Sequence, residues 1–69
     1  MSITVIPVSD DYLLHVSVVP VPSVGGHHLR IESQWLAARD PQARQLQYSV
    51  TLPGDQLFEI AAVINEGTS

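Results

Sequence analysis

The residues best suited to bind a metal are three histidines and two aspartates, His15, His27, His28, Asp10 and Asp11. Adjacent residues of a strand point to opposite faces of a sheet, so His27 and His28 would not converge on one ion. The spacings HxH, HxxxH and HExxH are absent, and the chain has no cysteine. We interpret the histidines as solvated side chains at loop edges and predict no metal site.

The sequence contains no recognisable catalytic motif. A Ser-His-Asp triad is defined by geometry rather than by order along the chain, but the GxSxG turn that presents a nucleophilic serine is absent. The chain has no lysine for a Schiff base, and no periodic pattern places two carboxylates together. We therefore predict a protein that is not an enzyme, with no catalytic residue and no cofactor.

Phosphate-binding and nucleic-acid-binding features are also missing. Gly25-Gly26 belongs to neither GxxxxGK[ST] nor GxGxxG and is typical of a flexible loop. The basic residues are three arginines, Arg30, Arg39 and Arg44, against seven acidic residues, which gives a net charge of −4. Binding to nucleic acid requires a cluster of positive charge, so we predict no nucleic-acid partner.

The size and composition indicate one folded domain, residues 1–69, with 45% hydrophobic and 14% charged residues. A chain this short buries only about 60% of the surface that its unfolded form exposes, and without cysteine it has no disulfide to add stability. We therefore expect oligomerisation. No segment has the pattern of a signal peptide or a membrane span, so we expect a cytoplasmic protein without a membrane partner.

Two strands are predicted in the first third of the chain. Ile3 to Val8 is rich in β-branched residues and has apolar side chains on both faces, so its pairing register is weakly specified; Pro7 favours a sheet edge. Tyr12 to Val19 alternates and should point one apolar face towards the core. The residues of that face are Tyr12, Leu14, Val16 and Val18.

Residues 27–38 have two interpretations. As a strand, they form a hairpin with Arg44 to Leu52 through a type I turn at residues 40–43; as a helix, Ser33 would cap residues 34–39. We prefer the strand because Arg44 to Leu52 supplies a partner with the same alternation. The predicted register opposes Trp35 to Tyr48, Ser33 to Val50, Ile31 to Leu52 and Arg39 to Arg44.

Gln56 to Glu66 has a helical period, with Asp55 or Gly54 as the N-terminal cap and Gly67 just beyond the C-terminus. An apolar stripe of Leu57, Ile60, Ala61 and Ile64 is expected to lie on the sheet. Phe58 and Val63 widen this stripe to about 220° of arc, which is more than one small sheet can cover.

The predicted fold is therefore α+β: a four-stranded antiparallel β-sheet (meander) with one C-terminal α-helix packed on one face. The opposite face should be mostly polar and carry a group that we name as a ligand-binding alternative, His15, His28, Arg30 and Glu32. Gln45 and Gln47 are expected on that polar face too.

The leading functional hypothesis is a small protein-interaction module that self-associates as a dimer. Its predicted interface residues are Phe58, Val63, Leu57 and Ala62. One alternative is an acidic inhibitor or decoy from a phage or mobile element that binds a larger protein. The other is ligand binding by the polar sheet face. No family resemblance is identified.

Overall fold

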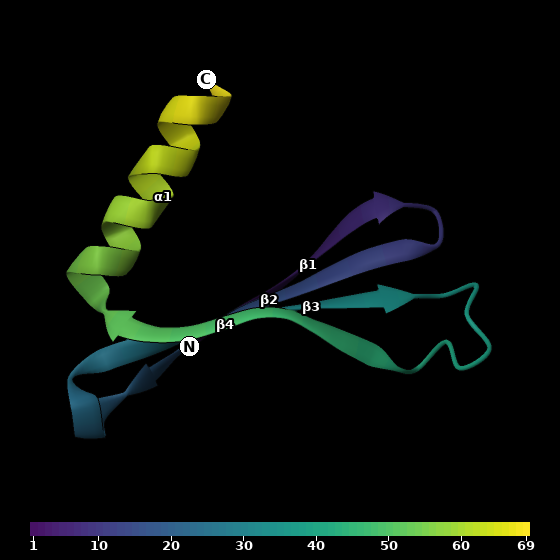
Figure 1. Cartoon of the computed structure of the whole chain (residues 1–69), viewed down its shortest axis with the longest axis horizontal. Coiled ribbons are helices and arrows are strands. Elements are labelled where there is room, and N and C mark those ends of the chain that lie inside the picture. The colour runs from purple at the N-terminus through teal and green to yellow at the C-terminus, as the bar shows by residue number, and fades with distance from the viewer.

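The protein consists of a four-stranded sheet followed by a single long helix. The structure, a computed structural model, describes every residue from 1 to 69. The elements are β1 (Ser2–Ser9), β2 (Tyr12–Val21), β3 (Gly26–Trp35), β4 (Arg44–Pro53) and α1 (Gly54–Thr68), with a short 3₁₀ turn (Pro22–Val24) after β2 (Figure 1). Each strand pairs antiparallel with the next, in the order β1-β2-β3-β4. The predicted α+β fold with an antiparallel meander and one C-terminal helix is confirmed.

The ambiguous segment is a strand only as far as Trp35. The backbone N–H of Leu36 donates to the carbonyl of Asp11 (2.7 Å), and the chain then leaves the sheet as an irregular loop over residues 36–43. Residues 36–39 are therefore neither strand nor helix. The predicted turn at residues 40–43 is present, because the N–H of Ala43 donates to the carbonyl of Asp40 (3.1 Å).

The predicted register of β3 and β4 is wrong by four residues. Ile31 lies opposite Tyr48, and Leu29 lies opposite Val50. The cause is the early end of β3, which makes the connection to β4 longer than the four-residue turn assumed from the sequence. A shift by an even number of residues keeps each side chain on its expected face, so the apolar residues still gather together.

A β-bulge changes the faces near the start of β4. The pairing skips Gln47, so that Glu32 lies opposite Leu46 and Ser33 opposite Gln45. Leu46 is thereby placed on the polar face and Gln45 on the apolar face, the reverse of the simple alternation that we expected. The side chain of Gln47 donates to the Oγ of buried Ser33 (2.8 Å), so Gln47 also reaches the apolar side.

The helix begins directly at the end of β4. Pro53 occupies its N-cap position without a side-chain hydrogen bond, so neither Gly54 nor Asp55 caps it. Gly67 lies within the last turn rather than beyond the C-terminus, which also differs from the expectation. Since no loop separates β4 from α1, the direction of α1 follows from the junction at Pro53 and Gly54. No helix in the structure has the length and hydropathy needed to cross a membrane.

The sheet and helix enclose no hydrophobic core. Only Gly26 and Ser33 are buried, and no apolar side chain is. The first turn of α1 touches the sheet through half-buried Leu57, and every other helical residue is exposed as α1 rises away from the strands (Figure 1). The radius of gyration is 13.9 Å, whereas a compact chain of this length has about 11 Å. The packing of α1 on one face is thus limited to its first turn.

Candidate interaction surface

One face of the sheet is mostly apolar. Residues that pair directly across two strands point to the same face, and the observed registers therefore assign each side chain. The large apolar side chains of this face are Ile6, Tyr12, Leu14, Val16, Val18, Leu29, Ile31, Trp35, Tyr48, Val50 and Leu52. No charged side chain interrupts them in these registers. We call this surface the apolar sheet face.

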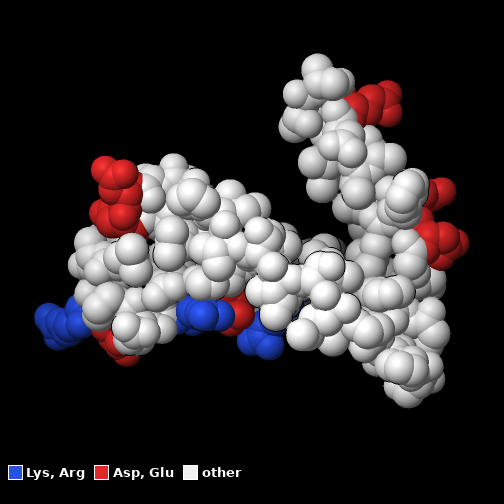
Figure 2. Space-filling view, turned by 180° about the vertical axis from the view of Figure 1, so that it is seen from behind, with Lys and Arg blue, Asp and Glu red and all other residues white.

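The helix stands on the same side as the apolar sheet face. Val18 and His27 line a hollow together with the first turn of α1, and Leu52 lines a second hollow of about 470 Å³ with Ile60 and Val63. The helix and the sheet enclose an open angle. We call the surface inside this angle the apolar notch; its residues include Val18, Leu52, Leu57, Phe58, Ile60 and Val63. Figure 2 shows mostly uncharged atoms between the helix and the sheet, and Glu59 is the one charged residue that lines either hollow.

The four predicted interface residues occupy different parts of this notch. Leu57 touches the sheet at the base, and Val63 lines the hollow beside Leu52. Phe58 borders the hollow near Val18 and remains 77% exposed. Ala62 is exposed and lines none of the main hollows. The structure therefore brings Leu57, Phe58 and Val63 to the notch.

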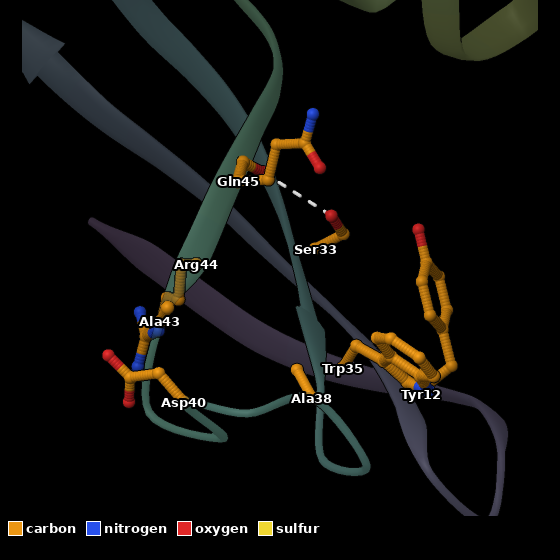
Figure 3. A pocket seen from close by; sticks show the side chains of 8 residues that line it. All are labelled: Tyr12, Ser33, Trp35, Ala38, Asp40, Ala43, Arg44 and Gln45. Carbon is orange, nitrogen blue, oxygen red and sulfur yellow. Dashed lines mark hydrogen bonds between the residues drawn. The ribbon is translucent and has the colours of Figure 1, made fainter.

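The apolar sheet face ends at an aromatic pair that the sequence analysis missed. Tyr12 and Trp35 lie directly opposite each other on β2 and β3, and their rings lie next to each other in Figure 3. They line a cavity of about 430 Å³ with the β3–β4 loop and the start of β4. Trp35 is still 53% exposed. Because the β2–β3 register was not predicted, the only signal for this pair was that both residues belong to the apolar faces of their strands.

The opposite face of the sheet carries the predicted ligand-binding group. His15 lies opposite Glu32, and Arg30 and His28 follow on the same face of β3. Each of these side chains has a polar neighbour. The contacts are His15 Nε2 with Gln34 Oε1 at 2.6 Å, His28 Nδ1 with Thr51 Oγ1 at 2.8 Å, and Glu32 with Arg30 at 3.4 Å and Arg44 at 3.9 Å.

These side chains, of His15, His28, Arg30 and Glu32, do not line any of the five main hollows of the surface. A ligand on this face would compete with the existing hydrogen bonds and ion pairs in the presence of water. No cluster of three or more His, Asp or Glu side chains has a geometry that could hold a metal ion.

His27 differs from its interpretation as a solvated histidine. It lies on the apolar sheet face opposite Leu52, and its ring approaches Gly54 at the start of α1. The Nδ1 atom is buried without a hydrogen-bond partner. His27 thus supports the base of the apolar notch, where β3, β4 and α1 meet.

The acidic residues lie in separate places rather than on one surface. The helix carries Asp55, Glu59 and Glu66 and no basic residue, and the other acidic groups lie at the β1–β2 turn, on the polar sheet face and, for Asp40, in the β3–β4 loop. Figure 2 shows the helical acids on the side turned away from the sheet. Of the helical acids, Glu59 borders the notch, because it lines the hollow beside Leu52.

Comparisons with known proteins do not place the chain in a family: no family model, no curated protein and no solved structure matches it.

Proposed function

We propose that this chain is a small non-enzymatic protein-interaction module that self-associates as a dimer. The observation that carries the proposal is that no apolar side chain is buried within one chain. A stable domain needs at least two layers of secondary structure around a shared core. Here the apolar face of the sheet and the apolar stripe of the helix do not cover each other. A second copy supplies the layer that covers both.

The exposed area supports this proposal quantitatively. A folded monomer of 7.5 kDa is expected to expose about 4,200 Å², whereas this chain exposes 5237 Å². The excess is about 1,000 Å² per chain, and a stable protein–protein interface buries about 800 Å² on each partner. The area left uncovered therefore matches one partner's share of a stable dimer.

The chemistry of the surface also supports association. Interface centres are enriched in aromatic residues and depleted in charged ones. Phe58, Trp35 and Tyr48 are each more than half exposed, and all lie on the helix or on the apolar sheet face. Burying these rings in contact with another protein removes them from water.

The test is the mass of the native protein at micromolar concentration, measured by light scattering during size-exclusion chromatography. We expect twice the chain mass of 7.5 kDa. Phe58→Asp should give the mass of one chain or unfold, because it places a charge among apolar side chains. A well-folded wild-type monomer would overturn the proposal.

Ser49→Asp is the matched control for that variant. It adds the same charge to the polar sheet face, where Ser49 lies opposite Arg30, and the dimer should persist. If Phe58→Asp also remained a dimer, the helix would not belong to the interface.

A further inference from the structure

Resting on the proposed self-association, we propose how the two copies meet: the helix α1 of each copy lies on the apolar sheet face of the other, within the other's apolar notch. The partner is a second copy of this chain, and the interface is reciprocal. Each copy thus contributes both the helix that inserts and the notch that receives it.

The dimensions of the two elements fit this arrangement. The helix of 15 residues is about 22 Å long at about 1.5 Å per residue, and strands of ten residues reach about 33 Å. Four strands about 4.8 Å apart present a face about 14–19 Å wide, which is wider than one helix about 10 Å in diameter. The chain's own helix meets this face only at its first turn, so a second helix has room.

The chemistry fits as well. The apolar stripe of α1 continues past Leu57 through Ile60 and Ile64, which are 37% and 59% exposed. It would face the centre of the partner's sheet, where Val16 lies opposite Ile31. Asp55, Glu59 and Glu66 lie outside this stripe; Glu59 lies at the rim of the hollow beside Leu52, where its carboxylate can reach water. Neither surface buries an unpaired charge.

A second copy is favoured over a different partner because the two uncovered surfaces are complementary and belong to the same chain. In a two-fold dimer each surface is used twice, once on each copy, and both are covered by one symmetric contact. Pairing through the edge strands β1 or β4 would add backbone hydrogen bonds but leave both apolar surfaces in water. Helix exchange would cover both apolar surfaces, whereas edge pairing would cover neither.

Cysteine cross-linking tests this geometry directly, because the native chain has no cysteine. Ile64→Cys on the helix is mixed with Val16→Cys on the sheet, the mixture is unfolded and refolded together, and mild oxidation follows. Each chain carries one cysteine, so any disulfide joins two chains. We expect a disulfide between the two different variants, identified by mass spectrometry, since a disulfide forms only between Cβ atoms about 4 Å apart.

Ser17→Cys is the matched control, because Ser17 neighbours Val16 on β2 and points to the polar face. Its disulfide with Ile64→Cys should be lost. Ile31→Cys provides a second sheet position on the apolar face, directly opposite Val16. Cross-links at neither Val16 nor Ile31, or equal cross-linking at Ser17, would overturn the helix exchange.

The outcomes separate this inference from the proposed function. A native mass of two chains without a helix–sheet cross-link would leave self-association standing and reject the exchanged arrangement. A native mass of one chain would reject both.

Discussion

At Gly26 the backbones of β3 and β4 approach each other closely. A Cβ atom built on Gly26 would lie 2.7 Å from the backbone oxygen of Leu52 and 3.0 Å from its carbonyl carbon. Those atoms belong to the paired strand and cannot move aside as a flexible side chain would. Glycine is needed here for space, whereas the preceding Gly25 has a positive φ of 65°.

We therefore predict that Gly26→Ala destabilises the fold by about 1–3 kcal/mol, the usual cost of forcing extra atoms into a close-packed site. Urea unfolding at a fixed protein concentration measures the effect. Gly67→Ala is the control: its Cβ would meet nothing within 4 Å, and alanine in a helix is favoured by up to about 1 kcal/mol over glycine. Equal unfolding midpoints for Gly26→Ala and wild type would contradict the prediction.

The face of the sheet on which a residue lies was predicted correctly where the alternation of strand residues alone determines it. The sequence assigned His15, His28, Arg30 and Glu32 to one face, and the observed pairing puts them there. It misplaced Leu46 and Gln45, because the bulge at Gln47 depends on how β4 pairs with β3 rather than on the residues of β4 alone.

The helix has little within its own chain to stabilise it. It has no side-chain N-cap and no buried residue, and isolated helices of fewer than about 12–15 residues are marginal in water. Packing of its apolar stripe is therefore the main source of its stability. The strands differ, since β2 and β3 each pair with neighbours on both sides.

From this difference we predict that amide hydrogen exchange in α1 depends on protein concentration. At dilution into the monomer, peptides from Gly54–Thr68 should exchange fastest among the regular elements, and they should gain the most protection on association. Peptides from β2 and β3 serve as the internal control and should change least. Strong protection of the helix in a monomeric sample would argue against this dependence.

The order and type of the elements followed from the sequence, but the pairing of β3 with β4 did not. The turn at residues 40–43 is present with its expected hydrogen bond, yet it does not close the hairpin. The decisive interaction is between Leu36 and Asp11, which keeps the end of β3 beside β2. A contact between residues so far apart in the chain leaves no local signal.

For the whole molecule, the apolar surface that stays exposed to water limits the folding stability of a single chain. The chain is extended, with dimensions of 39 × 33 × 16 Å, and no apolar side chain is buried. Burial of apolar surface is the dominant favourable contribution to folding. In the proposed dimer, most of that burial would take place on association, and folding would be coupled to association.

We accordingly predict that the thermal midpoint rises with protein concentration, because mass action favours the associated folded state. Circular dichroism melts over a wide concentration range would measure this. Ser49→Asp should show the same concentration dependence as wild type. A midpoint that stays constant across the range would contradict coupled folding and association.

The sequence by itself determined the local features: four short strands with alternating faces, one amphipathic helix, and a shortage of means for a single chain of this size to stabilise itself. These follow from the period of apolar residues, which is a property of neighbours along the chain. The tertiary structure decided the register of β3 and β4, the bulge at Gln47, the Tyr12–Trp35 pair and the open angle between α1 and the sheet. Each of these depends on contacts between distant segments, and the angle depends on a helix that starts at Gly54 with no loop to turn it back over the strands.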